Sequence, residues 1–226
     1  MFGNMSMSTK PRSIRWPAVH GAVFIGALLA VAIALPSIGW PWYLSLPLAA
    51  YECIAWTVPP LRQTAPSLAV GRMGGAPLVS AIVLNVLTTL VLVTYQAVAQ
   101  PDLRELAGNV PVTAFGGMVL AGLCFSLINA GLEELVFRGV LYEAMFAEWG
   151  ATIAVAVTAA FFGIGHMRGY PPGPAGVVLA AGFGVALGLL RWWTGGLGLA
   201  IGVHVCADAT IYGLLVWTGA FAEAVG

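Results

Sequence analysis

The chain has 226 residues, of which 60% are hydrophobic and only 8% are charged. Soluble domains carry about a quarter charged residues, so a soluble globular protein is excluded. The apolar content also excludes a disordered chain. Nine basic residues balance nine acidic ones, which excludes a basic surface for nucleic acid. The composition therefore predicts a polytopic membrane protein with a single domain.

Seven apolar runs are long enough to cross a bilayer, which takes about 20 mostly apolar residues in a helix. Turns rich in proline and glycine separate them, and the alternating segments of a β-barrel are not found. The fold class is therefore all-α, a transmembrane bundle of about seven helices. The runs cover about 17–36, 39–58, 76–99, 113–145, 150–167, 174–192 and 196–218.

The fourth run, 113–145, is longer than one crossing of the bilayer needs. Such a helix can be tilted, can protrude from the membrane, or can be broken near Gly116 and Gly117. The last arrangement would give eight segments. Elsewhere, two G-x-x-x-G patterns, Gly184/Gly188 and Gly198/Gly202, predict close packing between helices.

Basic residues precede the first run, as in a signal peptide. The run is longer than usual for a signal peptide and no A-x-A cleavage site follows it, which favours a retained anchor. We expect residues 1–15 to form a cytoplasmic tail and 16–226 an integral domain of the cell membrane, because basic residues favour the inside. The segments assigned to the inside hold Lys10, Arg12, Arg15, Arg62, Arg72 and Arg191, and those assigned to the outside hold Arg104 and Arg168.

Ionisable side chains inside a bilayer are costly and are candidates for function. Most of those in the predicted spans fall in the C-terminal half of the chain, and they form three short clusters. The three cysteines show no C-x-x-C spacing, so no disulfide framework or zinc knuckle is predicted. The ionisable residues identified in the spans are Glu52, Glu133, Glu134, Arg138, His166, His204 and Asp208.

The first cluster is the sequence EELVFR, from Glu133 to Arg138. Glu134 and Arg138 are four residues apart in the favoured order for an ion pair on one helical face. Glu133 is turned by about 100° from Glu134, so it can point elsewhere. Two adjacent carboxylates cannot both be ionised cheaply in a low dielectric, which suits a general base beside a structural partner. The alternative is a surface ion pair at the end of a helix.

The other two clusters are Phe162 with His166, and His204 with Asp208. His204 and Asp208 share a helical face, so they can hydrogen-bond or aim at one point. Alternatively, His166 is a packed interfacial residue and the His204/Asp208 pair only satisfies itself between helices. If the chain turns at about 146–149, Glu133 and His166 lie roughly 20 and 26 Å from the same surface, nearly level with each other. Neighbouring antiparallel helices would then bring them together in one polar site.

These three motifs, in this order and each on an apolar segment, resemble the CPBP family of intramembrane proteases, with its CAAX prenyl endopeptidases and Abi-type bacteriocin-processing proteins. The resemblance covers about 113–218 and implies peptide-bond hydrolysis below the membrane surface. It implies that Glu133 is the base that activates water, assisted by His166, and that His204 and the residue at 208 stabilise the oxyanion. Supporting roles are implied for Glu134, Arg138 and Phe162.

One position departs from the family pattern, because Asp208 stands where many members have asparagine. An ionised aspartate would repel an oxyanion. Asp208 can serve if it is protonated, if it orients His204, or if it binds a metal. Glu133, His166, His204 and Asp208 are suitable ligands for zinc or another divalent ion, and the family has been described both as metalloproteases and as glutamate-type proteases. We favour the mechanism without a metal or other cofactor.

Two further classes of intramembrane protease are disfavoured. A serine protease is disfavoured because no G-x-S-x-G lies in a span, and an aspartyl protease is disfavoured because Asp208 is the single aspartate there. A non-proteolytic immunity protein, scaffold or transporter is the alternative function. In a transporter, Glu52 would be needed together with the C-terminal cluster. The partners expected for a protease are the lipid bilayer and a peptide or protein substrate, with or without a lipid modification, and no nucleic acid.

Overall fold

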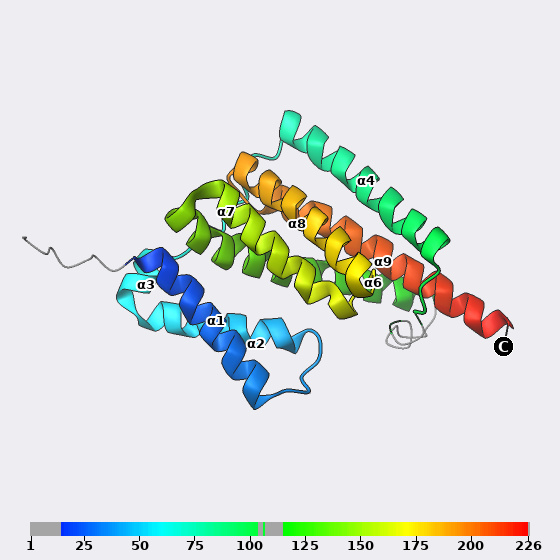
Figure 1. Cartoon of the computed structure of the whole chain (residues 1–226), viewed down its shortest axis with the longest axis horizontal. Helices are drawn as coiled ribbons and strands as arrows, with labels where there is room; N and C mark the ends of the chain where they lie inside the picture. The colour runs from blue at the N-terminus through cyan, green and yellow to red at the C-terminus, as the bar shows by residue number, and fades with distance from the viewer. Residues whose placement is uncertain (1–14, 104–105, 107–114, 226) are drawn as a thin grey trace, which may run out of the picture.

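The computed structural model describes residues 15–103, 106 and 115–225, with side chains up to Thr218. Within that part of the chain the regular structure is helical and no strand occurs, which confirms the predicted fold class (Figure 1). Residues 1–14 of the proposed tail (1–15), and Arg104, lie outside the described residues. The helices are α1 Trp16–Ala34, α2 Trp42–Thr57, α3 Pro59–Gln63, α4 Ala76–Ala99, α6 Phe115–Glu134, α7 Tyr142–Gly165, α8 Gly173–Thr194 and α9 Gly198–Val225.

Five helical segments among the described residues are long and apolar enough to cross a membrane. One of them, Phe115–Arg168, has 54 residues and reverses direction at Gly150, so it is long enough to cross more than once. Gly150 has φ 77° and ψ 179°, a conformation that residues with a Cβ rarely adopt. Together with the shorter α2, of 16 residues, this arrangement is consistent with about seven spans. The chain is therefore a multi-pass membrane protein.

Gly116 and Gly117 lie inside α6, so the described part of this run has no break at these glycines. The length of the apolar run 113–145 has another explanation. After α6 the helix continues through a π-helical segment, η1, Leu135–Leu141, into the first turns of α7. The reversal at Gly150 comes directly after the predicted turn at 146–149.

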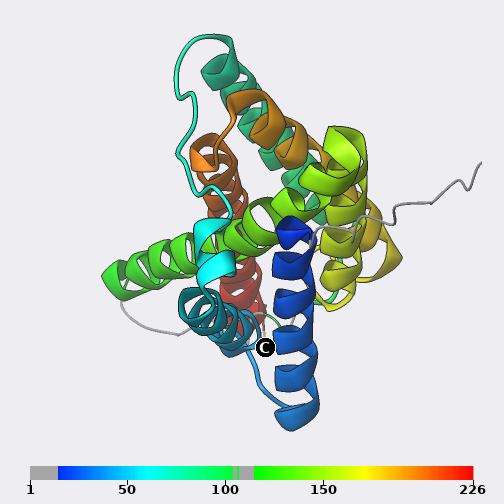
Figure 2. The same cartoon turned by 90° about the vertical axis from the view of Figure 1, so that its left-hand side faces the viewer.

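The helices α6 to α9 form the centre of the molecule (Figures 1 and 2). The hairpin of α1 and α2 packs on one side of this centre, and α4 packs on the opposite side. A hydrophobic cluster joins the hairpin to the π-helical segment, since Phe24 and Tyr51 of the hairpin share it with Val136 and Val140. The N-terminal helices thus support the segment that follows the two adjacent glutamates.

Small residues let α7 and α8 pack closely, as the first G-x-x-x-G pattern predicts. A Cβ atom added at Gly184 would lie 3.1 Å from the Cα of Ala159, and one at Gly188 would lie 3.2 Å from the side chain of Val155. The second pattern has a different role. Gly198 contacts the extended segment before α4, while a Cβ at Gly202 would meet none of the described atoms within 4 Å.

Candidate active site

The centre of the site is an imidazole between helices α6 and α9. Nδ1 of His204 lies 2.8 Å from Oε1 of Glu134. The same carboxylate oxygen accepts a hydrogen bond from Nη1 of Arg138 at 2.7 Å. Glu134 and Arg138 are 0% exposed and His204 is 2% exposed. The predicted ion pair between Glu134 and Arg138 is confirmed, and it is fully buried, so the surface alternative is wrong.

Two more carboxyl groups face the other nitrogen of the same ring. Nε2 of His204 lies 3.6 Å from Oε2 of Glu133 and 3.7 Å from Oδ1 of Asp208. Both carboxyl groups are buried. Glu133 and Glu134 therefore diverge as expected from their helical positions, but both reach the same imidazole from its two sides. This places the first and third clusters in one site.

Arg138 balances part of this negative charge and is held from several directions. Its Nη2 donates to the carbonyl of Gly184 at 3.1 Å. Its guanidinium carbon lies 4.5 Å from the centre of the Phe162 ring. A buried charge needs such partners, because removal from water is expensive unless the group is paired and hydrogen-bonded. Arg138 thus links α6, α7 and α8 around the site.

His166 lies at the end of α7, where the 3-10 turn η2, His166–Arg168, begins, and its ring packs at a tilt against that of Phe162. The centres of these two rings are 4.4 Å apart, and the ring of Phe162 is also 5.6 Å from that of His204. Nδ1 of His166 donates to the carbonyl of Phe162 at 2.8 Å, which leaves Nε2 of the neutral ring as an acceptor. His166 is half-buried and lies within electrostatic reach of His204 and Asp208. The second cluster therefore adjoins the other two, with Phe162 between the imidazoles.

Sequence reasoning missed a chain of hydrogen bonds that reaches Asp208 from the N-terminal hairpin. The indole N–H of Trp40 donates to Oδ1 of Asn129 at 3.0 Å. Nδ2 of Asn129 then donates to Oδ2 of Asp208 at 3.2 Å. Asn129 precedes Glu133 by one helical turn in an apolar run, and this spacing could have identified it. Trp40 is 89 residues from Asn129 in the chain, and no local pattern indicates that contact.

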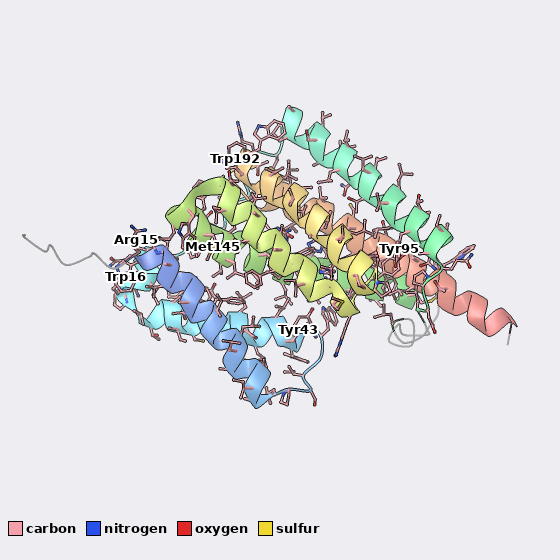
Figure 3. All side chains as sticks on the ribbon, in the orientation of Figure 1. Arg15, Trp16, Tyr43, Tyr95, Met145 and Trp192 are labelled. Atoms are coloured by element: carbon pink, nitrogen blue, oxygen red, sulfur yellow. The ribbon has the colours of Figure 1, made fainter. Side chains whose placement is uncertain are left out.

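The structure also adds residues to the set of buried polar groups. Tyr43, near the start of α2 (Figure 3), lies within electrostatic reach of Glu133 and Asp208. His20 of α1 is 1% exposed and hydrogen-bonds the hydroxyl of Tyr51 at 2.8 Å, although the list of ionisable residues in the spans omitted it. Glu52 is half-buried next to Tyr51 and belongs to this second region rather than to the site around His204.

The arrangement of the donor atoms decides whether a metal ion fits the site. Among the residues that the structure describes, no group of three or more His, Cys, Asp or Glu side chains is placed to hold a metal ion. Nδ1 of His204 is bonded to Glu134, and Nδ1 of His166 is bonded to a carbonyl. The four suggested ligands, as they lie, do not form a metal site.

The fold and the site define a class of protein: a multi-pass helical membrane protein with acids, an imidazole and an arginine buried together between its central helices, and a second, half-buried imidazole beside them. Residues 115–210 match the family model described as type II CAAX prenyl endopeptidase Rce1-like. The matched range contains all three clusters, and the match confirms the resemblance. The family implies an intramembrane endopeptidase that acts on a peptide or protein in a membrane. Neither the curated proteins nor the solved structures gave a match to the chain.

Proposed function

We propose that the chain hydrolyses a peptide bond of a membrane-associated peptide or protein and that Glu133 is the general base. The observation that carries this proposal is the position of Oε2 of Glu133. This oxygen is buried, has no hydrogen-bond partner among the described protein atoms, and faces Nε2 of His204. A base needs a free lone pair near a group that can stabilise the charge that it helps to create.

The reaction follows from these two groups. Glu133 takes a proton from water as the water oxygen forms a bond to the scissile carbonyl carbon. The carbonyl oxygen then carries the negative charge of the tetrahedral intermediate. When the carbon–nitrogen bond breaks, the proton on Glu133 passes to the leaving amine, and the base is restored.

His204 is the donor that we assign to the oxyanion. Its Nδ1 donates to Glu134, because an ionised carboxylate can only accept. Arg138 holds that carboxylate in turn, so the ring has a fixed orientation. Nε2 then points between Glu133 and Asp208, and it can donate to a developing oxyanion when the ring is protonated on both nitrogens.

Asp208 has a different role in this proposal from that of an asparagine at its position. One of its oxygens accepts from Asn129 and the other faces His204. These contacts support a function in orienting His204 and Asn129 rather than in binding the oxyanion. His166 assists Glu133 through its free Nε2, and Phe162 holds the ring of His166.

The substrate is expected to be hydrophobic or tethered to the membrane, because the site lies between apolar spans. Lipid-modified and unmodified peptides are both candidates. The orientation with the N-terminus in the cytoplasm of the cell and the location in the cell membrane stay predictions from the charge of the loops.

The test uses the full chain purified in detergent with a library of quenched-fluorescent peptides, lipid-modified and unmodified. Replacement of Glu133, His166 or His204 by alanine should each abolish cleavage, while Glu52→Gln should leave it intact. Retained cleavage in all three alanine variants would overturn the assignment. Transport that needs Glu52 together with the C-terminal cluster, with no cleavage by the wild type, would instead support the transporter.

A further inference from the structure

The π-helical segment changes the hydrogen bonds of the backbone next to the site. At its end, the N–H of Tyr142 donates to the carbonyls of Phe137 and Gly139. In an α-helix this N–H would donate to the carbonyl of Arg138, four residues earlier. The carbonyl of Arg138 therefore needs another donor, because buried backbone groups are costly to leave unpaired.

That donor is a second buried arginine, from α8. Nε of Arg191 donates to the carbonyl of Arg138 at 3.2 Å. Arg191 is 3% exposed, and the residue whose backbone it holds is the one whose guanidinium binds Glu134. Arg191 thus fixes the main chain at Arg138, and the guanidinium of Arg138 reaches into the site.

Further contacts fix the position of Arg191 itself. Its Nη2 donates to the carbonyl of Ser67 at 3.3 Å and forms an ion pair with Glu143. Its guanidinium carbon lies 5.7 Å from the centre of the Tyr142 ring. A planar guanidinium with donors on three nitrogens can make these contacts together, whereas a lysine ammonium cannot span them.

The segment that contains Ser67 is itself joined to the end of α8. The N–H of Leu197 donates to the carbonyl of Ala69 at 2.8 Å, and that of Gly198 donates to Val70 at 2.9 Å. The N–H of Arg72 donates in turn to the carbonyl of Thr194 at 3.1 Å. These backbone hydrogen bonds therefore hold the extended segment, with the Ser67 carbonyl that Arg191 binds, against the turn between α8 and α9.

We propose that Arg191 is a positioning residue that holds the π-helical turn and, through Arg138, sets the geometry of Glu134 and His204. The inference rests on the proposed function for its kinetic consequence, but its structural part is independent of it. Because reacting groups displaced by about 1 Å can lose about 100-fold in rate, loosening this turn should lower kcat. Loosening this turn should not change how the substrate peptide binds to the rest of the protein, so KM should stay the same.

The test compares Arg191→Gln and Arg191→Lys with Arg62→Gln, a matched change at an exposed arginine of α3. Glu143→Gln is a further variant that removes the ion pair but leaves Nε of Arg191 on the carbonyl of Arg138. Two properties are measured in detergent at equal folded protein: kcat and KM for a cleaved peptide, and amide hydrogen exchange of the peptide covering 135–143. If Arg191→Gln does not fold, Arg191→Lys keeps the charge beside Glu143 and carries the test.

We expect both Arg191 variants to lower kcat by about 100-fold at unchanged KM and to speed exchange at 135–143 by about tenfold. Glu143→Gln should keep most of the wild-type kcat, and Arg62→Gln should change neither property. Unchanged kcat and exchange in the Arg191 variants would overturn the inference, as would a lower Tm with unchanged kcat per folded molecule. If the wild type cleaves nothing, the proposed function fails, and the exchange measurement alone decides whether Arg191 holds the turn.

Discussion

His204 and Glu134 lie on different helices, and their side chains meet in the interior with Nδ1 of the imidazole 2.8 Å from Oε1 of the carboxylate. Arg138 donates to the same oxygen. This three-residue contact directs the second nitrogen of His204 toward Glu133 and Asp208. The catalytic proposal and the stability of the central helices therefore depend on the same buried charges.

Arg138→Met tests the structural part of this contact. The substitution leaves Glu134 buried without its cationic partner, and the loss of one partner of a buried pair costs about 3–5 kcal/mol. We expect a clear fall in Tm in detergent, measured by intrinsic fluorescence. Arg168→Met, at an exposed arginine on the 3-10 turn after α7, is the matched control and should leave Tm almost unchanged. An equal Tm for both variants would show that Arg138 is not a structural partner of Glu134.

Asp208→Asn tests the departure from the family pattern. An asparagine at 208 can still accept the hydrogen bond from Asn129 through its carbonyl oxygen, and it removes one negative charge next to the oxyanion. We expect this variant to keep activity within about tenfold of the wild type, whereas Asp208→Ala leaves the amide of Asn129 unpaired and should lose more. The measurement is kcat for one peptide in the three proteins. A large loss in Asp208→Asn would mean that the charge of Asp208 is itself required.

Trp40→Phe tests the hydrogen bond that orients Asn129. The indole N–H fixes Oδ1 of Asn129 as the acceptor, so its amide nitrogen faces Asp208. Loss of one such bond is worth about 1 kcal/mol, which corresponds to a fall in kcat of about fivefold if the orientation matters for the reaction. Trp56→Phe, at a tryptophan that is 67% exposed, serves as the control. The same kcat in Trp40→Phe and Trp56→Phe would show that the hydrogen bond from Trp40 does not contribute to the reaction.

Gly184→Ala tests the close approach of α7 and α8 behind Arg138. The added methyl group would lie 3.1 Å from the Cα of Ala159 and 3.3 Å from Nη2 of Arg138. Overpacking of this kind costs about 1–3 kcal/mol, so both Tm and activity should fall. Gly182→Ala on the same helix meets no described atom within 4 Å and should be neutral or slightly stabilising. A neutral result at Gly184 would mean that the two helices can separate freely.

Much of this fold could be predicted from the composition and from the pattern of apolar runs along the sequence. The apolar runs between prolines and glycines gave the spans to within a few residues, because the bilayer sets both the length and the polarity of a crossing helix. The spacing of Glu134 from Arg138, and of His204 from Asp208, correctly predicted which pairs share a helical face. These features are local, and helical periodicity determines them.

The features that could not be predicted depend on contacts between distant segments. The sequence of the π-helical segment, LVFRGVL, has no residue that excludes an α-helix, and the donor to its free carbonyl comes from Arg191, 53 residues away. Trp40 reaches Asn129 across 89 residues of the chain. The roles assigned to Glu133, His166, His204 and Asp208 stay proposals, because proximity alone does not establish which group reacts.

The most direct measurement is the cleavage of one susceptible peptide by the wild type and by Glu133→Gln, each with and without a chelator, with products identified by mass spectrometry. Glutamine has nearly the same shape as glutamate but cannot take a proton from water, so the variant should fold normally. A loss of general-base catalysis should lower kcat by at least about 100-fold, and the chelator should leave the wild type unaffected. Cleavage by Glu133→Gln at the wild-type rate would contradict the account, and loss of wild-type cleavage under the chelator would replace the metal-free mechanism with a metal-dependent one.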